Sequence, residues 1–428
     1  MSEKDRTIYI KGLWHQGLVA AAVWSHQGFL VTGICDSEEE AFRLNNGELP
    51  IYEPGLQDLI LSGIKAKFLK FETLDQKLTA PSFLAIMHDT EVNENDIVDT
   101  SRVFSDFRKL LTNINASTEV LITAQLPAGS SEMMAELIEN ECRFQSRVAY
   151  MPENLRLGQA IARFKYPELP VIGISNPDSQ TNLLQLFDSE IEIHFCDLVE
   201  AEILKSALNG FLALVIVYAN EISQICDSHN ANGWRVLELL RLEKRVGTKI
   251  PILPGLPFSG GTLGRDVQNL RTMRPSASGV IEGIWTSNIE RKEYFIDRIS
   301  KLALELGVSN IGLLGLTYKQ GTSTLRRSLA VEVGERLSAK GLKIFGFDPM
   351  SHNFDVPLPD SIINVNSLKL FTSKIELIVI MTPWDDVLTE LGGLDLHALT
   401  IIDPYGVFDS KELACKSYFH FGGSMVSS

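Results

Sequence analysis

The stretch TIYIKGLWHQG, residues 7–17, decides the fold of this chain. Its apolar first half predicts a β-strand, its glycines predict a tight turn, and the apolar residues that follow predict a helix through Ser25. A second predicted strand, Phe29–Cys35, completes a βαβ unit, whose two strands are expected to be parallel. Further predicted strands extend the unit into a doubly wound parallel sheet: Ser82–Met87, Val120–Thr123 and Val148–Met151.

The rest of the chain has a helical middle and a second α/β region. From Asp197 to Ser228 there is no proline and a single glycine, which predicts one helix of about 30 residues, roughly 45 Å long. A Pro/Gly-rich segment, Ile250–Gly264, follows it, and a second βα unit begins at Asn310–Gly315. The later strands of this region are predicted at Lys343–Phe347, Ile375–Met381 and Thr400–Asp403.

These patterns predict an α/β protein with two doubly wound Rossmann-like domains, joined by a central helical domain that contains the long helix. The expected boundaries are residues 1–197, 198–300 and 301–428. A chain of 428 residues exceeds the about 250–300 residues at which a single hydrophobic core stops growing, so several domains are expected.

Composition excludes several classes of function. The formal net charge of −15 disfavours a nucleic-acid partner, because neutralising phosphates requires a basic face. The first residues lack the apolar core of a signal peptide, and the longest apolar run, Phe211–Ala219, is shorter than a membrane span. Five cysteines without metal-type spacing indicate reduced thiols. We expect a cytoplasmic protein with no membrane partner and no metal.

The turn after the first strand is a modified dinucleotide-binding turn. Such turns normally carry three glycines, and the second lets backbone amides approach a pyrophosphate at the helix N-terminus. Gly12 and Gly17 are present, but Trp14 stands at the second position. The acidic residue that binds the adenosine ribose normally ends the second strand, where this chain has Cys35, with Asp36 one residue later. The alternative is a glycine turn that packs the helix and binds no cofactor.

The run NNGELPIYEPGL, residues 45–56, resembles the nucleotide-sugar 6-dehydrogenases, the family that includes UDP-glucose and GDP-mannose dehydrogenases. The resemblance continues in order along nearly the whole chain. It includes MPENLRLGQA at 151–160, EILKSALN at 202–209, KRVG at 244–247, and LGLTYK at 314–319 with Arg326 and Ser328. Function transfers less readily than fold, so the residues of the implied site need separate consideration.

The resemblance implies oxidation of a sugar C6 alcohol to a carboxylate in two hydride transfers to NAD, with a cysteine thiolate that captures the intermediate aldehyde. That cysteine belongs to a glycine-rich run which corresponds to FSGGTLGRD, residues 258–266, and Thr262 takes its place. A free thiol has a pKa of about 8.5, whereas a threonine hydroxyl needs a dedicated base. We therefore expect that the chain does not complete the family's oxidation to the uronate.

Other implied catalytic residues are retained. Lys205 and Asn209 are four residues apart on the long predicted helix and share one face, where the family uses them to hold water and stabilise oxyanions. Glu153 corresponds to a general base, and Asp266 to the aspartate that positions water and the lysine. The structural alternatives are a surface lysine or a partner of Glu202 for Lys205, a helix N-cap for Asp266, and a loop carboxylate for Glu153.

The resemblance also implies contacts to a nucleotide sugar, because basic groups suit a diphosphate, although single basic residues are otherwise ordinary surface charges. The implied substrate-binding residues are Leu155, Arg156, Arg245, Phe258, Gly260, Lys319 and Arg326. The family's counterpart of Arg245 reaches across a dimer interface, so a homodimer is expected. The C-terminal domain is then the sugar-nucleotide-binding domain and the central one the dimerisation domain.

The nicotinamide side differs more from the family. In the run AQLPAGS, residues 124–130, Gln125 replaces a threonine credited with a water contact, and His88 lies in the run MHDT, residues 87–90, that replaces a proline-rich strand end. His88 is either a new acid–base group or a structural histidine. The expected cofactor contacts are Gly12, Trp14, Gly17, Asp36 and Gln125.

Three hypotheses about function follow. In the first, the chain is an NAD-linked nucleotide-sugar oxidoreductase, acting on a UDP-sugar with altered chemistry. In the second, it is a non-catalytic sugar-nucleotide-binding or assembly homologue. In the third, it is a full dehydrogenase with Thr262 as nucleophile. NAD is expected rather than NADP, because no Lys or Arg directly follows Cys35 to bind a 2′-phosphate.

Overall fold

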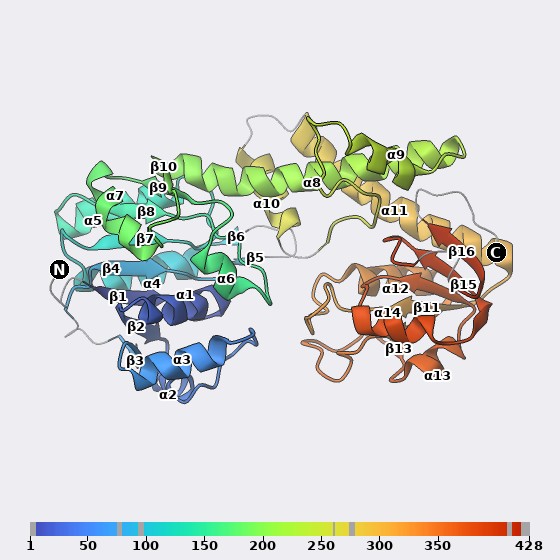
Figure 1. The fold of residues 1–428 in the computed structure, drawn as a ribbon, viewed down its shortest axis with the longest axis horizontal. Helices are drawn as coiled ribbons and strands as arrows, with labels where there is room; N and C mark the ends of the chain where they lie inside the picture. The colour runs from blue at the N-terminus through green and yellow to red at the C-terminus, as the bar shows by residue number, and fades with distance from the viewer. Residues whose placement is uncertain are drawn as a thin grey trace. The chain divides into compact units, whose positions relative to one another are not determined.

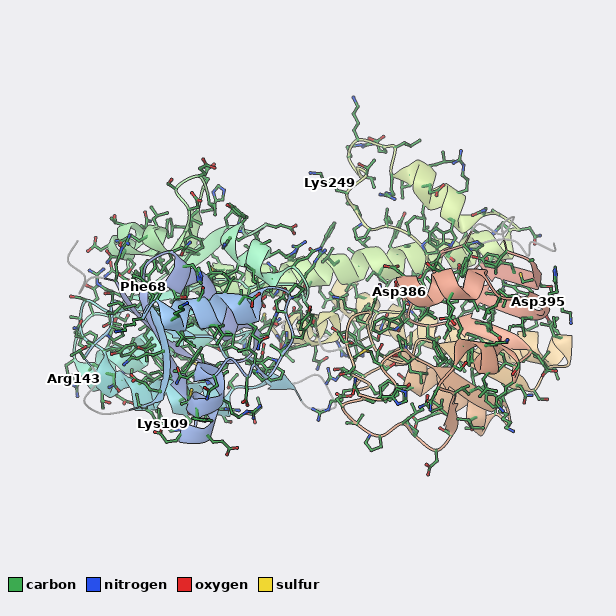
Figure 2. The ribbon with its side chains drawn as sticks, turned by 60° about the horizontal axis from the view of Figure 1, so that its bottom comes forward. Phe68, Lys109, Arg143, Lys249, Asp386 and Asp395 are labelled. Carbon is green, nitrogen blue, oxygen red and sulfur yellow. The ribbon has the colours of Figure 1, made fainter. Side chains whose placement is uncertain are left out.

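The computed structural model describes residues 6–74, 79–92, 98–259, 262–273, 279–408 and 413–420. Its internal contacts divide the chain into two units, Met1–Ala207 and Leu208–Ser428. The expected three-domain division stays a prediction. Figure 2 shows charged side chains, among them Lys109, Lys249 and Asp386, at the surface of the units.

The first unit is a sheet with helices on both faces (Figure 1). Its strands are β1 (Thr7–Lys11), β2 (Leu30–Cys35), β3 (Leu69–Thr73), β4 (Phe83–Ile86), β5 (Glu91–Val92), β6 (Val98–Asp99), β7 (Glu119–Ile122), β8 (Val148–Tyr150), β9 (Val171–Ile174) and β10 (His194–Asp197). Its helices are α1 (His15–His26), α2 (Glu38–Asn45), α3 (Leu56–Lys65), α4 (Ser101–Leu110), α5 (Ser130–Cys142), α6 (Ala160–Lys165) and α7 (Gln180–Leu183), with the 3₁₀ turns η2 (Leu111–Asn113), η3 (Pro177–Ser179) and η4 (Leu184–Leu186).

Strand order places the carboxyl ends of the central strands together. Among the described residues the main sheet runs β10-β9-β8-β7-β4-β1-β2-β3. Within this sheet, neighbouring strands are parallel except β8 and β9, which are antiparallel, so the expected all-parallel sheet is wrong at this pair. β5 and β6 form a separate antiparallel pair. The winding direction changes between β1 and β4, and open α/β sheets bind ligands in the crevice at such a switch point.

The periodicity of β1 and α1 explains the first core. Ile8 and Ile10 are fully buried on one face of the sheet, while Tyr9 belongs to the cluster on the other face. α1 is buried nearly all round from Leu18 to Trp24, as expected for a helix that packs between a sheet and other helices.

The second unit contains a smaller sheet, in which the winding also changes direction beside its first strand. Its strands run β13-β12-β11-β14-β15-β16 among the described residues, and all neighbours are parallel. They are β11 (Asn310–Leu314), β12 (Lys343–Phe347), β13 (Ile362–Asn364), β14 (Leu377–Ile380), β15 (Leu396–Asp403) and β16 (Cys415–His420). The helices of this unit are α9 (Gly233–Leu240), α10 (Leu263–Met273), α11 (Val280–Leu306), α12 (Leu329–Ala339), α13 (Leu368–Thr372) and α14 (Asp385–Gly392). The predicted second Rossmann-like sheet is thereby confirmed.

The long predicted helix is α8 (Leu198–Ser228), which begins in the first unit and ends in the second. Within the described residues it is the one helix long and apolar enough to cross a membrane, with a mean hydropathy of 1.5 over its most apolar window, half of which is buried. A core helix meets the same criteria. The polar side chains of Glu202, Lys205, Asn209 and Asn220 are buried along it, which is costly unless each finds a partner.

The turn after β1 allows no side chain at Gly17. A Cβ there would lie 2.1 Å from the backbone oxygen of Gly12, and backbone atoms cannot move aside as side chains do. We predict that Gly17→Ala lowers the free energy of unfolding by about 1–3 kcal/mol or more, measured by urea denaturation. Gly283→Ala is the matched control, because Gly283 lies in the first turns of α11 with open space around it and should gain about 0.5–1 kcal/mol. Equal effects of the two substitutions would contradict this account of the turn.

Candidate functional site

The glycine turn keeps the backbone geometry of a dinucleotide site. Gly12 has φ 98°, and a Cβ there would lie 2.5 Å from the backbone nitrogen of His88. α1 begins at His15 with no acidic residue in its first turn and no side-chain hydrogen bond from the N-cap residue Trp14. Trp14 is 46 % exposed. The positive end of the α1 dipole can therefore accept the pyrophosphate of a dinucleotide.

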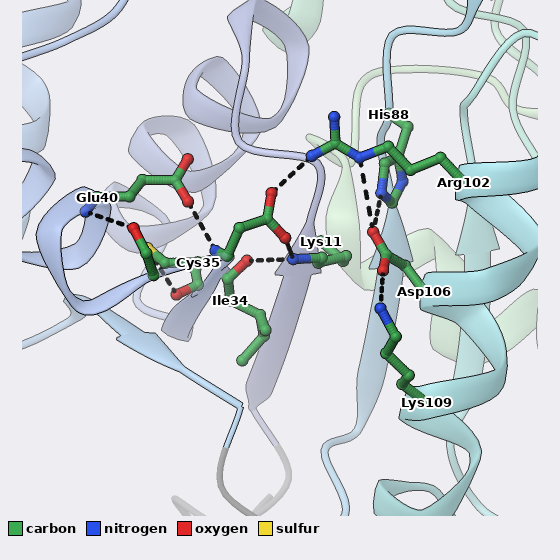
Figure 3. A network of polar contacts seen from close by, with 11 residues as sticks. Lys11, Ile34, Cys35, Glu40, His88, Arg102, Asp106 and Lys109 are labelled. Carbon is green, nitrogen blue, oxygen red and sulfur yellow. Dashed lines mark hydrogen bonds and ion pairs between the residues drawn. The ribbon is translucent and has the colours of Figure 1, made fainter.

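The end of β2 is different, because Asp36 is already engaged. Lys11 Nζ lies 2.5 Å from Asp36 Oδ1, and Arg102 donates to Asp36 Oδ2 over 2.6 Å (Figure 3). Cys35 is the last residue of β2 and is buried, and this burial raises the pKa of its thiol to about 12. Cys35 is therefore a core residue, and the expected ribose carboxylate, Asp36, is held in ion pairs.

A buried histidine and aspartate extend this network. His88 Nε2 lies 3.0 Å from Asp106 Oδ2, and Lys109 donates to Asp106 Oδ1 over 2.8 Å (Figure 3). Burial lowers the pKa of His88 below its usual 6.5, although Asp106 opposes the shift. Burial raises the pKa of Asp106, but the hydrogen bonds from Lys109 and His88 outweigh it and the pKa is lowered. Sequence analysis found His88 and missed its partner, because Asp106 lies 18 residues away on α4.

The residues present therefore fit one part of NAD and not another. The turn at Gly12 and Gly17 suits a pyrophosphate, whereas the ribose end does not fit without displacement of Arg102 from Asp36. Gln125 is partly buried, and its backbone oxygen accepts a hydrogen bond from Thr90 Oγ1 over 2.9 Å.

Within the described residues, no group of three or more His, Cys, Asp or Glu side chains could hold a metal.

In the first unit, Glu153 and Lys205 lie together at the carboxyl edge of the sheet. Lys205 Nζ donates to the backbone oxygen of Glu153, and to Asn154 Oδ1 over 2.7 Å. Burial raises the pKa of the Glu153 carboxyl, although Lys205 opposes this, and the charges of Asp89 and His15 also act on it. Lys205 is 5 % exposed, so it is not the surface lysine of the structural alternative.

Glu202 does not pair with Lys205 either. Its carboxylate accepts hydrogen bonds from the backbone nitrogens of Gly129 and Ser131, over 2.6 and 2.8 Å, and from the Ser131 hydroxyl over 2.7 Å. These groups open α5, so Glu202 caps that helix from α8. Lys205 is left to face the Glu153 loop.

Glu53 is a positioning residue that sequence reasoning missed. Its buried carboxylate accepts hydrogen bonds from the backbone nitrogens of Gly158 and Ala160, each over 2.9 Å, and lies 3.0 Å from His15 Nε2. It thereby ties the first residue of α1 to the loop that carries Leu155 and Arg156. The sequence signal that could have identified Glu53 is its position in the run at residues 45–56, which carries the resemblance to the family.

A mostly apolar pocket lies beside this loop, lined by Pro152–Leu155, Phe164 and Pro167–Ile172. Leu155 is partly buried and its backbone nitrogen donates to Glu153 Oε1, while Arg156 is exposed. The apolar walls account for the raised pKa of Glu153, because a charged carboxylate is disfavoured beside them.

In the second unit, Asn209 and Asp266 are in contact. Asn209 Nδ2 donates to Asp266 Oδ2, and both residues are buried. Thr262 is exposed and directly precedes α10, and its carbonyl accepts a hydrogen bond from the Asp266 nitrogen over 3.1 Å. Thr262, and not Asp266, therefore holds the N-cap position, so the N-cap alternative for Asp266 is wrong. Gly260 lies outside the described residues.

The loop before Thr262 is held by two helices. Asn288 of α11 makes hydrogen bonds to both the nitrogen and the oxygen of Phe258, over 2.8 and 3.0 Å. Arg291 Nη2 donates to the Gly255 oxygen over 2.9 Å, and Asn220 Oδ1 of α8 accepts from the Gly255 nitrogen over 2.9 Å. Asn288 and Arg291 were not predicted, because α11 shows no motif at these positions.

The remaining basic candidates are at the surface. Arg245 pairs with Glu243, with 3.1 Å between Nε and Oε1, and its side chain is 89 % exposed. Lys319 is exposed, and Arg326 Nε lies 3.6 Å from Asp355 Oδ2. Their roles in binding a nucleotide sugar stay predictions.

Comparison with known proteins agrees with this architecture. Residues 6–191 match the NAD binding domain of the UDP-glucose/GDP-mannose dehydrogenase family, residues 199–289 its central domain, and residues 312–412 its UDP binding domain. The chain belongs to this family, as its sequence predicted. Members of this family have an NAD-binding Rossmann domain and bind a nucleotide-sugar substrate.

Individual relatives cover nearly the whole chain. A UDP-glucose 6-dehydrogenase of Rickettsia bellii is 30% identical over 386 residues, which cover 88% of this chain and 88% of the relative. A UDP-glucose dehydrogenase structure from Pyrobaculum islandicum has 26% identity and a TM-score of 0.83 over 98% of both chains. A UDP-D-ManNAc dehydrogenase structure from Pyrococcus horikoshii has 23% identity and a TM-score of 0.83 over 97% of this chain and 99% of that one, a likeness of fold.

The hold on the Phe258 loop can be tested by Asn288→Ala. The substitution leaves a partly buried backbone nitrogen and oxygen of Phe258 without their partners, so the free energy of unfolding should fall by about 1–3 kcal/mol in urea denaturation. Asn364→Ala is the control, because Asn364 is exposed and makes a 3.3 Å contact with Asn366; it should stay within about 0.5 kcal/mol of wild type. The account of the loop is wrong if both variants behave alike.

Proposed function

We propose that this protein is a nucleotide-sugar oxidoreductase that acts on a UDP-sugar and lacks the thiol-dependent step to the uronate. The observation that carries the proposal is the contact of Lys205 with the Glu153 loop, in which a cation and a carboxyl with a raised pKa lie together at the ligand-binding edge of a sheet. Perturbed groups of this kind concentrate at functional sites. Membership of the dehydrogenase family gives the reaction class.

Each retained residue has a chemical role in this proposal. Glu153 accepts a proton from a substrate hydroxyl, a task that suits a carboxylate whose pKa is raised by burial. Lys205 Nζ, held by Glu153 O and Asn154 Oδ1, presents positive charge to a developing oxyanion. Asn209 and Asp266 form a hydrogen-bonded pair that holds water or a substrate oxygen. A nicotinamide dinucleotide supplies the hydride acceptor when bound.

None of the five cysteines is suited to replace the missing nucleophilic thiol. All five are free, and burial raises the pKa of Cys35, Cys142, Cys196 and Cys415. Cys226 is buried on α8. Thiols with raised pKa values are poor nucleophiles near neutral pH, because little thiolate is present. Thr262 is then an N-cap residue and not a nucleophile.

A second candidate function is a sugar-nucleotide-binding protein without redox activity. The ion pairs of Asp36 with Lys11 and Arg102 favour it, because they occupy the carboxylate that a dinucleotide's ribose would use.

We also propose that the protein acts in the cytoplasm as a homodimer. Phe211, Tyr218 and Ile225 follow one another at intervals of seven residues on α8 and are 51 %, 45 % and 56 % exposed. An exposed apolar stripe on one helix face is suited to a second copy of that helix. Free cysteines are typical of a reducing compartment.

Ligand-induced stabilisation separates the two candidates. A ligand at 100 times its Kd stabilises the folded protein by about 2.7 kcal/mol, which raises the unfolding midpoint measurably. In thermal-shift titrations we expect UDP-glucose or another UDP-sugar to raise the midpoint, with GDP-mannose as the nucleotide control. A rise with NAD as well supports the oxidoreductase, and a rise with the UDP-sugar alone supports the binding protein. No rise with any nucleotide sugar refutes both candidates.

The missing thiol predicts an asymmetric result at residue 262. Thr262→Ala should leave turnover of UDP-glucose with NAD unchanged, because the hydroxyl is not a nucleophile. Thr262→Cys should gain formation of the carboxylate product, because a thiol with a pKa of about 8.5 provides reactive thiolate. Products are identified by mass spectrometry. If wild type forms the carboxylate and Thr262→Ala abolishes it, Thr262 is the nucleophile after all.

A further inference from the structure

The network around Asp36 uses both oxygens of its carboxylate. Lys11 is 7 % exposed, ends β1, and reaches Asp36 Oδ1 over 2.5 Å and the Ile34 backbone oxygen over 3.4 Å. Arg102 of α4 takes Oδ2 over 2.6 Å. A buried lysine requires a partner, so Lys11 holds Asp36 strongly, whereas the Arg102 side chain is 64 % exposed and can move away.

A second carboxylate keeps Arg102 in place. Arg102 Nε lies 3.9 Å from Asp106 Oδ2, and Asp106 is itself fixed by His88 and Lys109. Arg102 lies in the first turn of α4, where the helix dipole disfavours a cation. Its position there is therefore explained by Asp36 and Asp106 and not by the helix.

The backbone of Asp36 is fixed as well. Its nitrogen donates to Glu40 Oε2 over 2.7 Å, and Ser37 Oγ caps α2 by accepting from the Glu40 nitrogen over 3.1 Å. The first turn of α2 is acidic, with Glu38, Glu39 and Glu40 in sequence. These charges repel a 2′-phosphate, so Arg102 is not explained as a receptor for NADP.

We propose that Arg102, with Lys11 and Asp106, sets the affinity for the adenosine end of a dinucleotide by competing with the adenosine ribose for Asp36. The ribose hydroxyls bind a carboxylate at the end of the second strand. In this chain they gain access to Asp36 only when Arg102 leaves it. The inference deepens the proposed function and rests on it, because it concerns binding of the same dinucleotide.

The test is calorimetric binding of NAD and of ADP-ribose, which carries the adenosine and pyrophosphate without nicotinamide. An exposed ion pair is weak, so Arg102→Ala should bind both ligands about two- to fivefold more tightly than wild type. Arg108→Ala is the matched control, because Arg108 lies on the same helix, is 62 % exposed and pairs with Glu141 over 3.7 Å. It should leave both affinities unchanged.

Asp36→Asn completes a double-mutant cycle. In wild type, where Arg102 already occupies Asp36, the substitution should change NAD affinity little; in the Arg102→Ala background it should remove the gain. The proposal is overturned if Arg102→Ala binds NAD no more tightly than wild type, if it shows no NAD binding, or if the gain survives Asp36→Asn. UDP-glucose binding to the same proteins tests the proposed function separately, because its loss would leave the NAD comparison intact.

Discussion

The close contact between two backbone segments in the turn after β1 is the constraint on which the first unit depends. Because nothing larger than hydrogen fits at Gly17 beside the Gly12 carbonyl, α1 begins directly at the carboxyl edge of the sheet. His15 is thereby placed against Glu53, and Glu53 in turn holds the backbone at Gly158 and Ala160. The loop that carries Glu153 is thus anchored to the turn that would hold a pyrophosphate.

Buried polar side chains position the other loops in the same way. Glu202 caps α5, and Asn220, Asn288 and Arg291 hold the segment that precedes Thr262. A buried polar group costs free energy unless it is bonded, and these residues meet that requirement by binding loop backbone. The cost of burying polar atoms on α8 and α11 is offset by these hydrogen bonds, which fix one loop within each unit.

The departures from the family that the sequence predicts concern chemistry more than scaffold. Thr262 directly precedes α10, Trp14 is 46 % exposed at the start of α1, and Cys35 is a buried core residue. None of them disturbs the parallel sheet, which explains how the chain keeps a TM-score of 0.83 to a UDP-glucose dehydrogenase structure. Membership of the family therefore does not fix the function, which has to be argued from the site.

The sequence by itself determined the family, the two Rossmann-like sheets and the long helix, because hydrophobic period and glycine position are local signals. It missed β9 and β10, which are only partly buried, whereas the predicted strands β4 and β7 are fully buried and mostly apolar runs of the same length. It also missed the antiparallel pairing of β8 with β9, because strand direction is set by tertiary contacts. It also identified Lys205, Asn209 and Asp266 as candidates, but it did not predict the hydrogen bonds that these residues make.

Only the tertiary structure decided which charges meet. Lys11 and Asp36 are 25 residues apart, Asp36 and Arg102 are 66 apart, and Glu53 reaches backbone 105 and 107 residues away. Such long-range pairs produce no periodic pattern in a single sequence, because each charged residue taken alone could equally well lie at the surface. They form because the parallel sheet brings the ends of β1 and β2 and the start of α4 to one edge, where burial makes an unpaired charge costly.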